Sequence, residues 1–419
     1  MASRTAPAAG FRLSSAAISR NPTPLGGAPV YARAEHPDEL VAATGKAAVP
    51  VSSSSRTIDA PRVLAPYVRI GVQGETLYLG FGSLQQAVND PTLWRPLVRL
   101  TAYFRAPRTR AEALTFLRDV CRVREPVAQA LLLTLESGNC LVRAHAYDPA
   151  DRYSRHALFY ELSGAQAEQV QRRLAEAHVL LLGCGGIGNL LAATLATAGV
   201  GELTLVDGDH VELSNLTRQF LFTEADVGLP KAEVLARELR RRASGCSVRT
   251  IVGSAPDAES LRALPEADLI LVSADSAGIT GLVNAHCVDS GQVWLNACYV
   301  NDIAVWGPLV IPGETGCWDC QALTARPPMD DPELAELISS VNGRYQAPSN
   351  GPVNMLASSL AVMDVLRHLG GFGVPASRNR RMGVWTHDLA LDTQSAERDP
   401  GCPTCASIRP VTQEPQGAR

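Results

Sequence analysis

Apolar and polar positions divide the chain into three stretches. Residues 1–60 are dense in Ala, Ser, Pro and Gly without periodicity, which predicts a disordered segment. From residue 61 to 147, two short β-rich runs around Gln73-Gly74 indicate a hairpin. Helical patterns follow near SLQQAV, LWRPLVRLTAYF, TRAEALTFLRDV and REPVAQALLLTLESG, and CLVRAHAY resembles a strand. The pattern predicts a small α+β domain over residues 61–147.

Residues 148–419 show a different pattern, in which short apolar runs alternate with helical periodicity. A loop and an amphipathic helix over 151–175 precede the strand-like segments VLLLG, ELTLVD, SVRTIVG, DLILVSAD and VWLNACYV. Helices are expected between them at 187–198, 229–243, 258–263 and 278–290. This alternation predicts an α/β fold with a doubly wound, mostly parallel, Rossmann-like sheet. The strand-like AVWGPLVIP, the helical VNMLASSLAVMDVLRHLGG and the strand-like RMGVWTHDLAL follow.

Composition narrows the class of protein. A chain of 419 residues has room for two or three domains, and a net charge of −4 gives no case for nucleic acid as a partner. The uncharged run 179–201 approaches membrane-spanning length, but its glycines favour a strand–turn–helix unit, so we expect no membrane span. The Ala/Ser/Arg-rich start fits a transit peptide or, preferably, disorder. Ten cysteines without a secretion signal argue against disulfides and for a cytoplasmic protein.

The run HVLLLGCGGIGNL, residues 178–190, carries the first candidate chemistry. Gly183, Gly185, Gly186 and Gly188 have the G-x-G-x-x-G spacing, by which a strand turns into a helix and presents backbone N–H groups to a phosphate. Asp207 ends the next strand, 19 residues after Gly188, where a carboxylate can accept hydrogen bonds from a ribose. Up to this point NAD fits as well as ATP, and a glycine turn that only packs a helix on a strand is a further alternative.

The next loop, VDGDHVELSNLTRQFLF, favours ATP. Its polar residues, with a lysine at the head of the following helix, are Asp207, Asp209, Asn215, Arg218, Gln219 and Lys231. A dehydrogenase needs no such set, whereas guanidinium and ammonium groups neutralise a triphosphate. Loop Arg and Lys are commonly surface residues, but Lys46 and Lys231 are the only lysines of the chain. Asp275 ends LILVSAD, at a strand tip where a carboxylate can hold Mg²⁺ against phosphates.

Together these residues resemble the adenylating domain of the ThiF/MoeB and ubiquitin-activating superfamily. The matching motifs are Gly183-x-Gly185-x-x-Gly188, Asp207-x-Asp209-x-Val211-x-x-Ser214-Asn215-Leu216-x-Arg218-Gln219, Gly228-x-Pro230-Lys231 and Asp275, and the resemblance covers about residues 150–410. It extends upstream to RYSRH, residues 152–156, which is similar to the RYxRQ motif of the family. His156 replaces the usual glutamine, a departure that we associate with the microcin-type branch.

The resemblance implies an adenylyltransferase that uses ATP and Mg²⁺. It assigns Asp207 to the ribose, Asn215, Arg218 and Lys231 to the phosphates, and Asp275 to the magnesium ion. Arg155 would reach across a homodimer to the triphosphate of the neighbouring subunit. With the triphosphate neutralised, a substrate carboxylate can attack the α-phosphorus and release pyrophosphate, which leaves an acyl adenylate.

Two C-x-x-C pairs, Cys317/Cys320 and Cys402/Cys405, form a candidate metal site. Four thiolates can hold zinc in a closed tetrahedral site, although 81 residues separate the pairs and a redox role for either pair is the alternative. In the superfamily such distant pairs clamp the C-terminal segment, so the resemblance implies structural Zn²⁺. The six other cysteines are expected in the core. No cysteine lies between Cys320 and Cys402, which disfavours a thioester relay, and Cys287 and Cys298 are weaker candidates for it.

The N-terminal domain suggests the substrate. YVRIGVQGETLYLG, the following helices and LESGNCLVRA loosely resemble a winged-helix-like, PqqD-like element that captures leader peptides by strand addition. RYSRHALFYELSG and NACYVNDIAVWGPLVIPGETGCWDC look most like the MccB-type branch, which adenylates a ribosomal precursor peptide in antibiotic biosynthesis. One alternative is a leader-binding partner of a YcaO-type cyclodehydratase, which has usually lost its ATP residues. The other is activation of a ubiquitin-like sulfur carrier.

Overall fold

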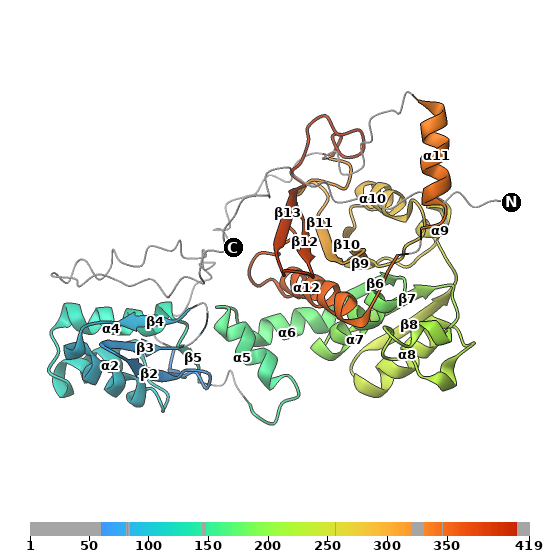
Figure 1. Cartoon of the computed structure of the whole chain (residues 1–419). Coiled ribbons are helices and arrows are strands. Elements are labelled where there is room, and N and C mark those ends of the chain that lie inside the picture. The colour runs from blue at the N-terminus through green and yellow to red at the C-terminus, as the bar shows by residue number, and fades with distance from the viewer. Residues whose placement is uncertain are drawn as a thin grey trace. The chain divides into compact units, whose positions relative to one another are not determined.

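A computed structural model of the chain describes residues 60–80, 82, 84–144, 148–255, 257–320, 331–345 and 347–408 (Figure 1). The predicted disordered segment, apart from Ala60, lies outside these residues. Two compact units divide between Val170 and Gln171, within helix α6 (Ala167–Glu176). The predicted boundary after residue 147, where the adenylation domain is expected to begin, stays a prediction.

The N-terminal unit is a small α+β structure. Strands β2 (Ile70–Gln73), β3 (Thr76–Leu79) and β4 (Gln86–Val88) form an antiparallel sheet in that order, and β1 (Arg62–Leu64) pairs with β5 (Leu141–Arg143). Its helical segments are α2 (Pro91–Tyr103), α3 (Arg110–Thr115), the π-helical turn η1 (Phe116–Val120), α4 (Glu125–Ser137) and α5 (Ser154–Leu162). The predicted hairpin at Gln73-Gly74 is confirmed, because β2 and β3 reverse there.

One predicted element of this unit is wrong. The segment SLQQAV was expected to be helical, but its residues 86–88 form strand β4. Val88 pairs with Leu77, and Gln86 pairs with Leu79. A six-residue helical pattern is too short to specify a helix, so strand pairing decided its structure.

The second unit contains a mixed sheet of eight strands, in the order β13-β12-β11-β10-β9-β6-β7-β8. The strands are β6 (His178–Leu182), β7 (Glu202–Asp207), β8 (Ser247–Val252), β9 (Leu269–Val272), β10 (Val293–Val300), β11 (Ile303–Val310), β12 (Arg380–Trp385) and β13 (Leu391–Ser395). The five neighbouring strands β10, β9, β6, β7 and β8 are parallel. On the other side of β10, strands β11, β12 and β13 each run antiparallel to the strand before them in the sheet. The predicted mostly parallel α/β fold is confirmed. The strand-like RMGVWTHDLAL is a strand only up to Trp385, where β12 ends; the chain then reverses and β13 begins at its last residue, Leu391.

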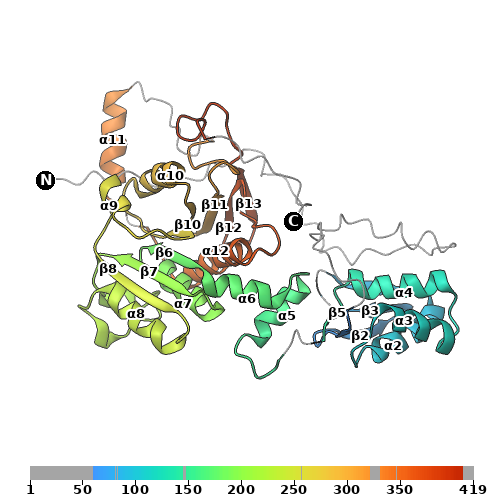
Figure 2. The ribbon, with the colours of Figure 1, turned by 180° about the vertical axis from the view of Figure 1, so that it is seen from behind.

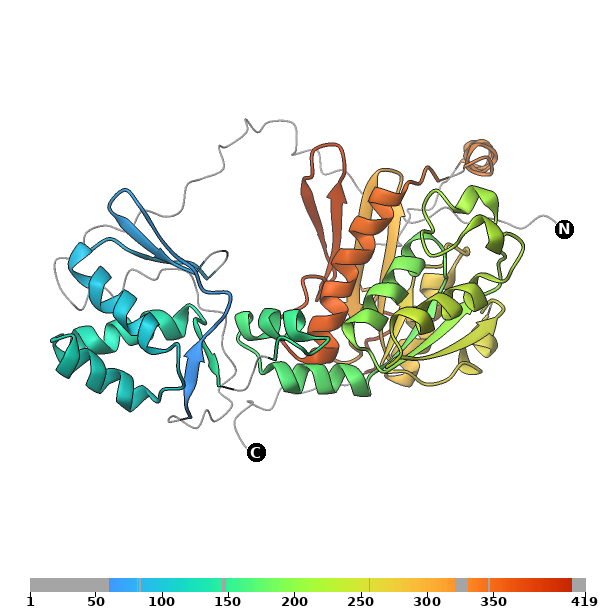
Figure 3. The ribbon, with the colours of Figure 1, turned by 90° about the horizontal axis from the view of Figure 1, so that it is seen from below.

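Helices cover both faces of this sheet (Figures 1 and 2). One face carries α7 (Gly186–Ala198), α8 (Lys231–Arg242) and α12 (Gly351–Gly370), and the other carries α9 (Ala258–Arg262) and α10 (Ile279–Ser290). Helix α12 lies along β10 and β11 and packs against α7 (Figure 3). Helix α11 (Pro332–Asn342) has no buried residue. Within the described residues, no helix has the length and apolar character that a membrane span requires.

The sheet has a topological switch point between β6 and β9. These two strands are parallel neighbours, yet the helices that follow them, α7 and α10, lie on opposite faces. Open α/β sheets bind ligands at the carboxyl ends of such strands, because the two connections leave in opposite directions. The glycine motif follows β6, and Asp275 lies three residues after β9, so both lie at this point.

Candidate nucleotide-binding active site

The glycine motif forms a tight turn in which Gly183 and Gly188 leave no room for a side chain. Gly183 has a φ of +93°, and a Cβ there would lie 2.7 Å from the backbone nitrogen of Ala274. A Cβ on Gly188 would lie 1.9 Å from the carbonyl oxygen of Gly183. A Cβ on Gly185, in contrast, would meet no atom of the described residues within 4 Å. Gly183 and Gly188 therefore pack the turn onto the neighbouring strand end, and Gly185 borders open space.

The first turn of α7 offers backbone N–H groups to an anion. Gly185 is its N-cap residue, and no side chain caps this helix end. Helix N-termini leave backbone donors unsatisfied and carry a partial positive charge, so they bind phosphate. A Cβ on Gly186 would lie 3.5 Å from Cγ of Arg218. The stem of this arginine therefore lies beside the same helix end.

Asp207 joins the glycine turn to the end of β7. Its carboxylate accepts the backbone N–H of Cys184 at 2.6 Å and that of Asp209 at 2.8 Å. Burial raises the pKa of Asp207, and these two N–H groups oppose that rise. The carboxylate is thereby fixed at the strand end, next to the turn that is expected to hold the phosphates.

Lys231 is the first residue of α8 and is 7% exposed. Its ammonium lies 2.8 Å from a carboxylate oxygen of Asp209, and its backbone N–H donates to the Asp209 carbonyl. The Asp209 side chain is 75% exposed, whereas that of Lys231 is 9% exposed. A buried ammonium needs an anionic partner, and an exposed carboxylate can give way to a phosphate.

The rest of the polar loop is held by its own backbone. Asn215 is buried, and its side-chain oxygen accepts the N–H of Glu212 at 3.1 Å. Arg218 is half-buried and donates to the carbonyl of Ser214 at 2.8 Å. Gln219 is 3% exposed, and its Oε1 is buried without a hydrogen-bond partner among the described residues. Such an unsatisfied acceptor in a nucleotide site is available to a ligand donor.

Asp275 and Arg155 are exposed candidates, like Asp209. Asp275 lies two residues after Ser273, whose hydroxyl donates to the Gly183 carbonyl at 2.8 Å, so the strand end that carries Asp275 adjoins the glycine turn. An exposed carboxylate at this place fits the oxygen ligands that Mg²⁺ prefers. Arg155 is exposed on α5 and belongs to the N-terminal unit, whereas the other candidates belong to the second unit.

Two buried asparagines support the site and were missed in the sequence. Asn189 lies on α7, is fully buried, and accepts the N–H of Leu221 at 3.1 Å. It thus ties helix α7 to the loop that carries Arg218. Asn354 on α12 is fully buried, and a Cβ on Gly186 would lie 2.1 Å from its Nδ2. A lone asparagine within an apolar helical pattern was the available signal, because a buried amide needs partners.

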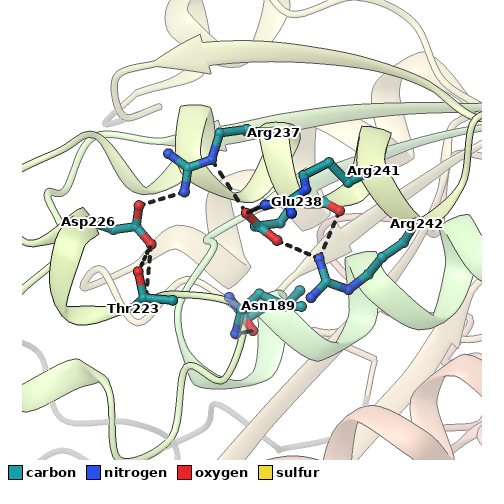
Figure 4. A network of polar contacts seen from close by, with 8 residues as sticks. Asn189, Thr223, Asp226, Arg237, Glu238, Arg241 and Arg242 are labelled. Carbon is teal, nitrogen blue, oxygen red and sulfur yellow. Dashed lines mark hydrogen bonds and ion pairs between the residues drawn. The ribbon is translucent and has the colours of Figure 1, made fainter.

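A polar network fixes the far end of the loop to α8 (Figure 4). Asp226 is 3% exposed and accepts hydrogen bonds from both the backbone N–H and the hydroxyl of Thr223, each at 2.8 Å. Arg237 of α8 donates to its other oxygen at 2.5 Å, and this arginine and Thr223 together lower the pKa of Asp226. The loop is thereby tied at Leu221 to α7 and at Asp226 to α8.

The four predicted zinc ligands come together. The sulfur atoms of Cys317, Cys320, Cys402 and Cys405 all lie within 4.8 Å of one another, and all four residues are buried. The Cys317–Cys402, Cys317–Cys320 and Cys320–Cys405 sulfur distances are 3.6, 3.8 and 3.2 Å. Tetrahedral zinc at its usual bond length separates thiolates by roughly 3.8 Å. The residues therefore fit zinc, with no position left open for catalysis.

The other cysteines offer little chemistry. Cys140, Cys184, Cys246 and Cys287 are buried, as expected, whereas Cys121 and Cys298 are half-buried. Burial raises the pKa of Cys287 to about 12, so this thiol stays protonated and unreactive at neutral pH.

Similarity to known proteins identifies the family. A model described as the ThiF family matches residues 153–404, which is more than half of the chain. The chain belongs to the ThiF family. It is 31% identical over 259 residues to the sulfur carrier protein ThiS adenylyltransferase of Escherichia coli, covering 61% of this chain and 94% of that protein. The molybdopterin-synthase adenylyltransferase of E. coli is 29% identical over 260 residues, covering 61% and 95%.

Solved structures extend the similarity beyond the family domain. Crystal structures of E. coli MccB are 36% identical and cover 82% of this chain and 99% of MccB, and the one with ATP has a TM-score of 0.76. Another, with a TM-score of 0.77, holds this "Microcin C7 biosynthetic enzyme" in complex with N-formylated MccA. The structure of PaaA, at 20% identity and a TM-score of 0.59, shares the fold. This ThiF-family protein is an adenylyltransferase that uses ATP, as predicted, and not a dehydrogenase.

Proposed function

We propose that this ThiF-family enzyme adenylates a carboxylate of a ribosomally synthesised precursor peptide, in the maturation of a peptide natural product. One observation carries the proposal. The second unit makes up less than two thirds of the chain, so the 82% coverage by MccB extends into the N-terminal unit. The sulfur-carrier adenylyltransferase of E. coli, in contrast, matches 61% of the chain. The chain therefore shares with a peptide-modifying enzyme the part that goes beyond the common adenylation domain.

The residues of the site can perform this reaction through charge. The N–H groups at the start of α7, Arg218 and Lys231 bind the phosphates, with Asn215 and Gln219 beside them, and Asp207 binds the ribose. Lys231 leaves Asp209 for the triphosphate, and Arg155 of a partner subunit adds a further positive charge in a homodimer. Mg²⁺, held by Asp275, would supply further charge neutralisation. A carboxylate oxygen then forms a bond to the α-phosphorus while the bond to pyrophosphate breaks.

The cysteine cluster has a structural role in this proposal. Zinc held by Cys317, Cys320, Cys402 and Cys405 would join the chain after β11 to the C-terminal segment. Four thiolates complete its coordination, so it has no place for a substrate.

The N-terminal unit is the proposed binding site for the leader of the precursor peptide. Among the described residues, strand β2 is an edge of its three-stranded sheet, so one side of its backbone is left for pairing. Ile70 and Val72 on this strand are 37% and 58% exposed. An extended peptide can add to such an edge through backbone hydrogen bonds and place apolar side chains on this surface.

The direct test supplies the purified protein with ATP, Mg²⁺ and the precursor peptide encoded beside its gene. Peptide-dependent exchange of pyrophosphate into ATP is expected, with a product that has gained an AMP or lost water. Asp275→Ala should abolish turnover and retain peptide binding. Exchange that depends on a ubiquitin-like carrier ending in Gly-Gly, and not on the peptide, would support the sulfur-carrier function. Peptide binding without turnover in the wild type would indicate a partner of a YcaO-type enzyme.

Arg155 is tested by mixing two inactive variants. Arg155→Ala and Asp275→Ala are each expected to be inactive alone. After subunit exchange, a heterodimer holds one intact site, so about a quarter of the wild-type activity should return. Activity that stays absent after mixing, with heterodimers shown by mass spectrometry, would place Arg155 outside the neighbouring site.

A further inference from the structure

A stack of arginines and aromatic rings lies on the helical part of the N-terminal unit. The rings of Tyr103 and Phe116 are parallel, with centroids 4.2 Å apart and an interplanar angle of 8°. The guanidinium of Arg108 lies 4.5 Å from the Tyr103 centroid, and that of Arg99 lies 5.8 Å from the Phe116 centroid. Each ring thus contacts a cation, an arrangement that favours both partners and holds the guanidinium groups in place.

Most of the arginines around this stack have no ion-pair partner within the described part of the chain. Residues 91–124 contain eight arginines and two acidic residues. Arg110 and Arg118 have ion pairs, with Glu136 for the first and with Asp119 and Glu125 for the second. Six arginines have no carboxylate within ion-pair distance in the part of the chain that the structure describes: Arg95, Arg99, Arg105, Arg108, Arg122 and Arg124.

Three of these arginines lie at the stack or on the same helix face and form what we call the arginine patch: Arg95, Arg99 and Arg108. Arg95, Arg99 and Tyr103 are spaced four residues apart on α2, so they share one face of the helix. The backbone of Arg108 is hydrogen-bonded to that of Arg62 in β1, at 2.8 and 2.9 Å. Its Nε is buried without a hydrogen-bond partner among the described residues, so an acceptor is missing here.

The π-helical turn places one ring of the stack. Phe116 begins η1, and its carbonyl accepts the N–H of Cys121 at 3.1 Å, five residues on. Such turns replace the regular α-helical pattern in short stretches and are frequent at functional sites. The patch therefore combines fixed cations, a fixed aromatic pair and a missing acceptor.

We infer that the arginine patch binds an acidic segment of the peptide substrate. The inference rests on the proposed function, because the peptide is the partner proposed for this unit. Guanidinium groups bind carboxylates through two parallel hydrogen bonds. Alternate residues of an extended peptide are about 6.8 Å apart, close to the spacing of about 6 Å between side chains one helical turn apart. Two acidic residues at i and i+2 can therefore reach Arg95 and Arg99 together.

A nucleic acid is the competing ligand and fits less well. The whole chain has a net charge of −4, and residues 91–124 carry eight arginines and two acidic residues, a charge of +6. The rest of the chain therefore carries a net charge of −10. That charge opposes a long polyanion which extends past the patch. A short acidic segment places its charge at the patch alone.

The test measures binding of a fluorescent decaglutamate peptide to the full-length protein by anisotropy, without ATP. Binding is expected at low salt, and it should weaken as salt rises, since the contact is electrostatic. Arg99→Ala/Arg108→Ala should weaken it about tenfold, because two charge-assisted contacts are lost. The matched control removes two arginines of α8 that already pair with Glu238, in Arg241→Ala/Arg242→Ala, and should bind like the wild type.

A further variant and two further ligands distinguish binding of an acidic peptide from binding of nucleic acid. Arg95→Ala lies outside the stack, so it should weaken binding severalfold at an unchanged melting temperature even if the double variant folds poorly. A decaserine peptide should not bind. A decathymidine oligonucleotide that binds more tightly than decaglutamate would overturn the inference in favour of nucleic acid. Decaglutamate binding that is absent, or unchanged in both patch variants, overturns it outright. Peptide-dependent pyrophosphate exchange is measured separately, so its failure alone would refute the proposed function and not the arginine patch.

Discussion

The nucleotide site and the cysteine cluster differ in how their parts come together. The candidate nucleotide site lies at the ends of parallel strands, and its glycines, Asp207, Lys231 and Asp275 each belong to a local strand–turn–helix unit. The cysteine cluster joins two short segments that are 81 residues apart in the chain. One site is open and keeps exposed charges, whereas the other is closed and buried.

This difference indicates what each site is suited for. A binding site for a soluble substrate must leave donors and charges unsatisfied until the ligand arrives, as at the uncapped start of α7. A structural metal site satisfies every ligand and gains stability from the loop that it closes. Variants at the cluster should therefore affect stability, whereas most variants at the nucleotide site should affect ATP binding and turnover.

Loss of a cysteine ligand is expected to have the largest effect. In Cys402→Ser, zinc content measured by mass spectrometry should fall from one per chain to nearly none. The melting temperature should fall by about 10 °C, since metal binding is coupled to folding. Cys246→Ala, at a buried cysteine outside the cluster, should keep its zinc. One zinc per chain in Cys402→Ser would contradict the proposed site.

Lys231→Ala should leave zinc in place and reduce kcat/KM for ATP. The ammonium is expected to stabilise the charge that develops on the phosphates, and losing one such group costs on the order of 10²- to 10³-fold. The measurement is peptide-dependent pyrophosphate exchange. Arg241→Ala on the same helix is the control and should behave like the wild type, because its partner is Glu238. A Lys231→Ala variant with normal exchange would remove this residue from the site.

Two glycine substitutions separate folding from binding within the nucleotide site. Gly188→Ala should destabilise the protein by about 3 kcal/mol, because the added Cβ meets the Gly183 backbone. Gly185→Ala adds a Cβ in open space, so stability should change by less than about 1 kcal/mol, but KM for ATP should rise. Urea unfolding and initial rates measure the two effects. Equal destabilisation by both substitutions would show that the turn is purely structural.

Two buried asparagines provide the finest comparison between the sites. Asn189→Leu removes the tie between α7 and the Arg218 loop, so KM for ATP should rise about tenfold while zinc stays bound. Asn284 is also fully buried, and it bonds Trp318 and Asp319 beside the cluster at 3.0 and 2.9 Å. Asn284→Leu should lower the melting temperature about as much as Asn189→Leu does, and it should leave KM for ATP unchanged. If both variants change KM alike, Asn189 has only a structural role.

The sequence by itself determined the features that depend on residues close together in the chain. Short continuous apolar runs at the strands and helical periodicity between them predicted the Rossmann-like alternation from 178 to 300 nearly segment by segment. The glycine spacing predicted the turn, because the Cβ atoms it omits would overlap neighbouring backbone at Gly183 and Gly188. Asp207, Lys231 and Asp275 stood out because they follow strands or begin a helix.

Only the tertiary structure decided features that depend on distant partners. SLQQAV includes a strand because Val88 pairs with Leu77, and the strand in RMGVWTHDLAL ends at Trp385 because the chain reverses there to pair β13 with β12. The four cysteines meet through folding alone, since spacing along the chain does not fix distances across 81 residues. The roles of Asn189 and the arginine patch depend on contacts between different elements, so a local sequence pattern could not predict them.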